Sequence, residues 1–199
     1  MPYRVLFASL LLLCFSLVAA AADTLHEVAR NGDVEDLKRY LDQGANLEQP
    51  DETGETILIA AALVGQSAVV EILIARGANI QARNHNGLTA LHATAYAGHL
   101  DVAALLIKSG ADVNDSANRL STTPLHLAAE EKQLAVVELL LAKGATVEAE
   151  EMNGYTAITQ AGWREHWDVV SALKKAGANC QPESFTGEWL YSRCEKLNP

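Results

Sequence analysis

The chain has 199 residues, of which 49% are apolar and 20% are charged, so it can bury a core and global disorder is excluded. Its formal net charge is −10, from 25 acidic and 15 basic residues. An acidic surface repels nucleic-acid phosphates and anionic lipid headgroups, which leaves proteins or cationic ligands as the expected partners.

The N-terminal segment, residues 1–22, predicts a secretory signal peptide. Arg4 is its only charged side chain, residues 5–18 are almost wholly apolar, and small residues occupy 19–22. This order is typical of a signal peptide, and cleavage after residue 20, 21 or 22 fits. We therefore expect a periplasmic or secreted protein whose mature charge is −10 − 1 = −11.

Two alternatives compete with a cleaved signal. An uncleaved anchor needs about 20 apolar residues and no alanine-rich exit site, whereas this segment is shorter and has such a site. A lipidated cysteine requires a small residue before it, but Leu13 precedes Cys14. After cleavage we expect no contact with the membrane.

An internal repeat runs through the rest of the chain. Gly-Ala pairs recur at spacings of 33, 33, 34 and 33 residues, starting at Gly44, Gly77, Gly110, Gly144 and Gly177. Two other series keep the same phase. The first series is Gly32, Gly65 and Gly98, and it continues with Lys132 and Glu165 in place of glycine. In the second series a threonine follows two residues after each of Gly54, Gly87, Ser121 and Gly154.

Each unit predicts a pair of helices. In the clearest copy, Thr123 and Pro124 suit the N-cap and the first turn of a short inner helix with a narrow alanine face. A second, broader apolar helix covers residues 136–141, and Gly144 ends it. The extra residue of the 34-residue interval belongs near residues 115–118, in a loop where insertion costs little.

These motifs resemble the ankyrin repeat. Residues 121–145 are STTPLHLAAEEKQLAVVELLLAKGA, and residues 87–111 preserve GLTALH and GHLDVAALLIKSGA. The resemblance implies an all-α solenoid of five stacked helix-turn-helix repeats, because one repeat cannot bury its apolar faces alone. The predicted repeats are residues 23–50, 51–83, 84–117, 118–150 and 151–181, followed by a C-terminal cap at 182–199.

The C-terminal cap contains one of the two cysteines that follow the signal. Leu190, Cys194 and Leu197 have helical spacing there, and Cys180 lies at the end of the last repeat. An even cysteine count in an oxidising compartment predicts a disulfide, which stabilises by about 3 kcal/mol for a loop of this size. The alternative, a reactive redox pair, usually has its cysteines two residues apart.

The sequence contains no constellation that predicts catalysis, a cofactor or a metal site. His26, His92 and His126 share one repeat position, where the resemblance implies hydrogen bonds between adjacent turns. Glu130 and Glu131 are neighbours that diverge on a helix, so we interpret them as solvated charges instead of an acid and base pair. We therefore expect a binding protein and no enzyme.

The resemblance places partner-binding residues at the turn tips and on the exposed side of the inner helices, which together form a concave strip. Apolar and aromatic groups on this strip favour a protein interface. For Trp163 two interpretations stay open: contact with a partner, or packing against the C-terminal helix. The predicted binding residues are Leu63, Val64, His85, Leu88, Tyr96, Glu130, Glu131, Tyr155, Trp163 and Arg164.

We expect a monomer that binds a protein in the same exported compartment. The small periplasmic ankyrin-like proteins of Gram-negative bacteria are the nearest known group by resemblance, some of them associated with catalases and peroxide defence. The alternative is an immunity protein that covers the active site of a basic toxin or effector enzyme.

Overall fold

The computed structural model describes residues 25–197, so the predicted signal peptide lies outside the described residues. Residues 25–31 are helical, and they are followed by α2 (Val34–Asp42), α3 (Ile57–Leu63), α4 (Ser67–Ala75), α5 (Ala90–Ala97), α6 (Leu100–Lys108), α7 (Pro124–Glu130), α8 (Leu134–Ala142), α9 (Ala157–Trp163), α10 (Trp167–Lys175), α11 (Glu183–Thr186) and α12 (Glu188–Lys196). Residues 25–197 contain no strand, only an isolated bridge between Glu150 and Thr156.

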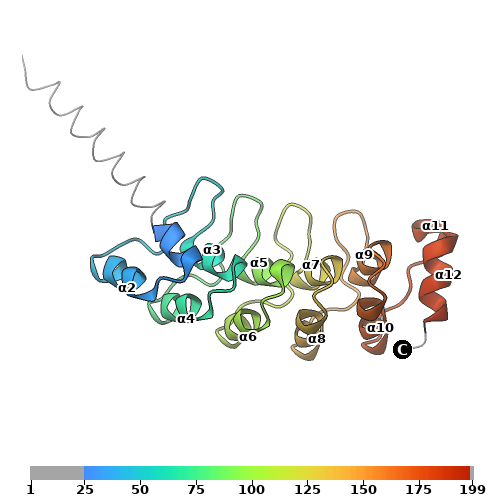
Figure 1. Cartoon of the computed structure of the whole chain (residues 1–199). Coiled ribbons are helices and arrows are strands. Elements are labelled where there is room, and N and C mark those ends of the chain that lie inside the picture. The colour runs from blue at the N-terminus through green and yellow to red at the C-terminus, as the bar shows by residue number, and fades with distance from the viewer. Residues whose placement is uncertain (1–24, 198–199) are drawn as a thin grey trace, which may run out of the picture.

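The helices form two layers in an elongated stack (Figure 1). The inner layer contains α3, α5, α7 and α9, each packed on the next, and the outer layer contains α4, α6, α8 and α10. A loop connects each outer helix to the next inner helix and projects along one edge of the stack. We call these loops the fingers and define them as residues 51–55, 84–88, 118–122 and 151–155. The expected all-α solenoid of stacked helix-turn-helix repeats is confirmed.

The inner helices are short and pack closely because they carry small residues. In α3 every residue from Ile57 to Ala62 is buried, and Ala95 and Ala129 occupy the positions equivalent to Ala62 in the next two repeats. A threonine precedes each inner helix in extended backbone, and Thr123 makes a capping box with His126 ahead of Pro124. The expected N-cap at Thr123 is therefore present.

The outer helices supply the larger part of the core. Each buries three apolar side chains at one repeated set of positions, as in Val136, Val137 and Leu140 of α8 and Val169, Val170 and Leu173 of α10. Burial of one such side chain stabilises by roughly 1.5–3 kcal/mol. The buried residues form one cluster from Leu25 to Cys194, so the core is continuous through the stack.

A tight turn joins the two helices of each repeat and requires a left-handed residue. Gly65 and Gly98 have φ of 77° and 82°, and a Cβ on Gly98 would collide with Gln133 of the next repeat. Gln133 occupies that space and donates from Nε2 to the carbonyl of Tyr96 at 3.2 Å. Lys132 keeps the same conformation at φ 59° despite its side chain.

Replacement of Lys132 by glycine is expected to stabilise the protein by about 1 kcal/mol, because glycine adopts a left-handed φ without the steric cost of a Cβ. Lys143→Gly is the matched control, since Lys143 caps α8 at φ −98°. Urea unfolding followed by circular dichroism measures both variants. Stabilisation of the two variants by equal amounts would contradict this account.

The C-terminal cap consists of α11 and α12 and closes the end of the stack (Figure 1). The Cys180–Cys194 disulfide is present and joins the last repeat to α12. Leu190 of α12 packs on Gly162 of α9, and its Cδ1 atom lies 2.5 Å from where a Cβ on Gly162 would be. Earlier repeats have alanine at this position, so glycine marks the place where the cap approaches.

Candidate protein-binding surface

The fingers are rigid turns, each held by the side chain of its first residue. Asn84 accepts hydrogen bonds through Oδ1 from the backbone N–H groups of Asn86 and Leu88, both at 3.0 Å. Asp51, Asn118 and Glu151 do the same in the other fingers. Hydrogen bonds at Asp51 from Thr53 and Arg30 outweigh the opposing effect of burial and lower the pKa of Asp51 to about 2.

Backbone hydrogen bonds connect neighbouring fingers into one row. The N–H of His85 donates to Thr53 at 3.2 Å, that of Arg119 to Asn86 at 3.3 Å, and that of Met152 to Leu120 at 2.8 Å. The ring of His85 lies where a Cβ on Gly54 would be, so His85 covers the preceding finger while staying exposed. The row therefore presents a defined edge.

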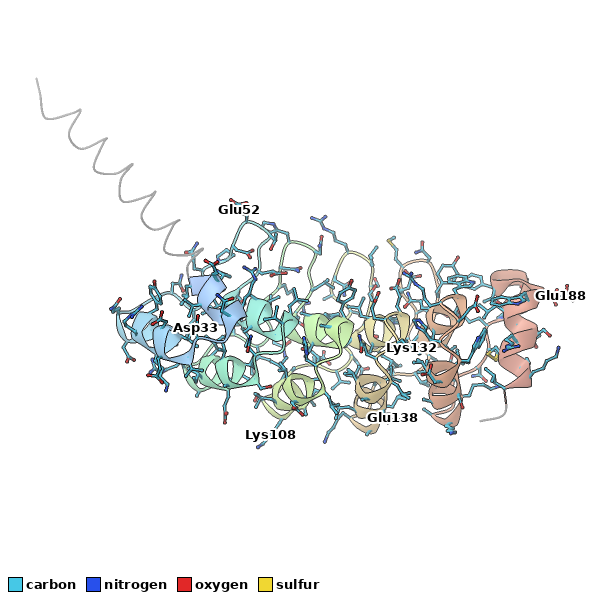
Figure 2. The ribbon with its side chains drawn as sticks, in the orientation of Figure 1. Asp33, Glu52, Lys108, Lys132, Glu138 and Glu188 are labelled. Carbon is cyan, nitrogen blue, oxygen red and sulfur yellow. A yellow bond between two sulfur atoms is a disulfide. The ribbon has the colours of Figure 1, made fainter. Side chains whose placement is uncertain are left out.

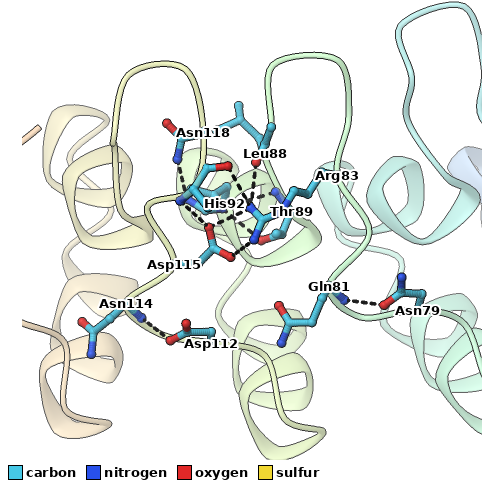
Figure 3. Close-up of polar contacts among 12 residues, drawn as sticks. Asn79, Gln81, Arg83, Leu88, Thr89, His92, Asp112, Asn114, Asp115 and Asn118 are labelled. Carbon is cyan, nitrogen blue, oxygen red and sulfur yellow. Dashed lines mark hydrogen bonds and ion pairs between the residues drawn. The ribbon is translucent and has the colours of Figure 1, made fainter. Parts of the chain in front are cut away.

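Buried histidines fasten α5 and α7 to the next finger, and His26 does the same for the helical residues 25–31. His92 accepts from the N–H of Thr89 through Nδ1 at 3.3 Å and donates from Nε2 to the carbonyl of Thr122 at 2.9 Å (Figure 3). His126 repeats this pattern with Thr123 and the carbonyl of Tyr155. The expected hydrogen bonds between adjacent turns are confirmed.

An ion pair supports the same region. Arg83 donates to both carboxylate oxygens of Asp115 and to the carbonyl of Gly87, and Asp115 is buried (Figure 3). Burial alone would raise the pKa of Asp115, but the contact with Arg83 lowers it. The 34-residue spacing between Gly110 and Gly144 predicted an extra residue in a loop near residues 115–118. Asp115 lies in this segment, and the segment is a loop in the structure.

A shallow apolar hollow lies beneath the fingers on the inner helices, and it is the central feature of this face. Its volume is about 270 Å³. Three residues predicted from the sequence meet here, namely Leu63, Leu88 and Tyr96, and Tyr96 is 50% exposed. The remaining lining residues are Glu55, Ile59, Asn84, His92, Ala93 and Leu127.

The aromatic residues of the last repeat form a row at the other end of the strip. The rings of Tyr155 and Trp163 meet edge to face with centroids 4.3 Å apart, and Phe185 of α11 lies 5.0 Å from Tyr155. Trp163 and Phe185 remain 42% and 43% exposed. Trp163 therefore contacts Tyr155, and it keeps a large face open to solvent.

The charged residues predicted for the strip are partly engaged. Arg164 donates to Glu130 of the preceding repeat at 2.6 Å, and this ion pair lies at the surface, with the two side chains 57% and 32% exposed. Val64 is exposed and Glu131 is half-buried. Glu52 lies at the tip of the first finger, whereas Lys108 and Glu138 lie on the outer helices at the opposite edge (Figure 2).

Sequence reasoning missed some members of this surface. Leu127 lines the hollow from α7, and it is large where Ala60 and Ala93 stand in earlier repeats, which is a signal that the sequence did offer. The residues that open the fingers also recur with the period, three positions before Gly54, Gly87, Ser121 and Gly154. Phe185 carries no such signal, because it lies beyond the repeats.

Within residues 25–197 no group of three or more His, Cys, Asp or Glu side chains is arranged to hold a metal ion. Over the same described residues, no helix combines the length and the apolar character that a membrane crossing needs.

Comparison with known proteins identifies the fold family. The model for ankyrin repeats in three copies matches residues 25–117 and 114–184. This chain belongs to the ankyrin-repeat family. Ankyrin repeats form protein–protein interaction modules and are typically binding scaffolds without catalytic activity.

A curated relative covers only part of the chain. A probable E3 ubiquitin-protein ligase from Oryza sativa subsp. japonica is 45% identical over 51 residues, which is 26% of this chain and 10% of that protein. The ankyrin-repeat chain thus spans a small part of that relative's length.

The histidine contacts predict a loss of stability in mild acid. Burial lowers the pKa of both His92 and His126 below the ordinary value of 6.5. Below this value the unfolded chain binds protons that the folded chain does not, so the free energy of unfolding falls by at most about 1.4 kcal/mol per pH unit for each histidine. Urea unfolding midpoints measured between about pH 7.5 and 5.5 should decrease accordingly.

The control for this effect is the double variant His92→Gln/His126→Gln, which removes both titrating groups. Its unfolding free energy should start lower but change less over the same pH range. An identical pH dependence in the variant and the wild type would show that other groups cause the acid sensitivity.

Proposed function

We propose that this protein is an exported ankyrin-repeat module that binds another protein through the hollow and the aromatic row. The observation that carries the proposal is the hollow itself, where Leu63, Leu88 and Tyr96 present apolar walls on the finger side. Tyrosine is a typical anchor of protein interfaces, and exposed apolar patches mark interaction sites, so a defined hollow can accept a protruding side chain of the partner. The rigid row of fingers limits the entropy lost on binding.

Two features support export to the periplasm or the exterior. The signal-like segment at residues 1–22 predicts it, and the Cys180–Cys194 disulfide is of the kind that persists in oxidising compartments. A basic or neutral protein partner suits the mature charge of −10 − 1 = −11. Within this proposal we place a role linked to peroxide defence first and blockage of a toxin or effector enzyme second.

Export is tested by producing the full chain in a Gram-negative host and sequencing the N-terminus of the periplasmic fraction. The mature chain should begin at Ala21, Ala22 or Asp23. Retention of the full-length chain in the cytoplasm, or in the membrane with Met1 intact, would contradict the proposed cleavage.

Binding is tested with Tyr96→Ala and Trp163→Ala in the mature protein. Both side chains are half exposed, so helical circular dichroism should stay unchanged. Each variant should weaken capture of the native partner by roughly tenfold or more, because exposed aromatic anchors contribute more than 1 kcal/mol. Leu100→Ala is the control, since Leu100 is equally exposed but begins the outer helix α6.

The captured partner is identified by mass spectrometry after affinity purification from the exported compartment of the native organism. An effector enzyme in a tight one-to-one complex would favour the immunity role. A catalase, together with peroxide sensitivity when the gene is deleted, would favour the role in peroxide defence. Capture that is unaffected by both aromatic variants would remove the proposed surface.

A further inference from the structure

The C-terminal cap has few contacts of its own to hold it in place. The four residues of α11 include no buried side chain, and α12 buries only Leu190 and Cys194. Helices of this length are marginal in water without tertiary support. Lys174 adds one hydrogen bond from Nζ to the carbonyl of Cys194 at 2.8 Å. Trp189 and Arg193 of α12 also contact the ring of Trp167, and the bridge from Cys180 is the one covalent attachment of α12 to the last repeat.

The same cap supplies one residue to the proposed binding face. Phe185 of α11 lies beside Tyr155 and over Gly154, where its Cζ atom is 3.1 Å from the place of a glycine Cβ. Tyr155 in turn carries the ring of Trp163. Phe185 thus forms the outer end of the aromatic row, and α11, which carries it, lies in the segment between the two bridged cysteines.

We propose that the Cys180–Cys194 disulfide is a redox lock on the binding face. While the disulfide is intact, it holds Phe185 against Tyr155. When a thiol or dithiol reductant reduces the disulfide, α11 and α12 are released and binding at the aromatic row is weakened. The inference rests on the proposed function, because it assigns regulation to that same face.

The chemistry of the lock is thiol–disulfide exchange. A reductant thiolate attacks the sulfur of Cys180, the more exposed cysteine, and forms a mixed disulfide while Cys194 leaves as a thiolate and takes a proton. A second reductant thiol then attacks the mixed disulfide and frees Cys180. The chain gains two electrons and two protons, and the reductant leaves as its disulfide.

The first measurement follows the cap alone, by hydrogen exchange and mass spectrometry on the mature protein. Oxidised wild type is compared with dithiothreitol-treated wild type and with Cys180→Ser/Cys194→Ser. In both bridge-free forms the amides of α12 should exchange at least about tenfold faster, while those of α5 to α8 keep their rates. Unchanged protection of α12 without the bridge would overturn the lock.

The second measurement follows binding of a fluorescein-labelled peptide selected from a random display library on the oxidised mature protein. Phe185→Ala and the double serine variant should each lower the affinity for the peptide by about tenfold. Trp189→Ala is the matched control, because Trp189 is a 58% exposed cap residue that packs on Trp167 away from Tyr155. Its affinity should equal that of the wild type.

The two proposals fail in different ways in this experiment. If Tyr96→Ala lowers the affinity for the peptide but Phe185→Ala and removal of the disulfide do not, the lock is overturned and the proposed binding face stands. If Phe185→Ala and removal of the disulfide lower the affinity for the peptide but Tyr96→Ala does not, the hollow is not the binding site and the lock stands. Equal weakening by Trp189→Ala would also overturn the lock, because the effect would not be specific to the aromatic row.

Discussion

Every repeat of this chain depends on its neighbours to cover its apolar faces. The outer helices bury sets such as Val136, Val137 and Leu140, and the inner helices bury alanines that allow a close approach. A helix pair of this size cannot exclude water from both faces, so burial is completed only by stacking. The result is one core that runs from Leu25 to Cys194, and both of its ends must be protected.

Polar contacts set how each repeat sits on the next. His92 and His126 link inner helices to the following finger, and Gln133 reaches back to the carbonyl of Tyr96. These groups are buried or half-buried, so an unmade hydrogen bond would cost more than a formed one contributes. They therefore fix the position of each repeat, while apolar burial, which is not directional, supplies most of the stability.

This geometry also shapes the binding face. The fingers are closed turns joined to one another, so they project as a row instead of folding onto the inner helices. The hollow lies where three successive inner helices and two neighbouring fingers meet, and Leu127 and Tyr96 form part of its wall. At the C-terminal end the cap takes the place of a further repeat: Leu190 packs on Gly162 and Phe185 extends the aromatic row.

The sequence by itself determined the period, the helix pairs and the cysteine pairing, and its resemblance to ankyrin repeats implied the role of the repeated histidines. These features depend on local spacing or on a position that recurs in phase with the repeat, such as His26, His92 and His126. The resemblance likewise implied that Leu63, Leu88 and Tyr96 lie on the concave strip. Only the tertiary structure decided that they meet with Leu127 in one hollow, that Glu130 pairs with Arg164, and that Phe185 joins Tyr155. These contacts join residues about 30 apart in the chain, and the stacking geometry that brings them together is set by the whole array.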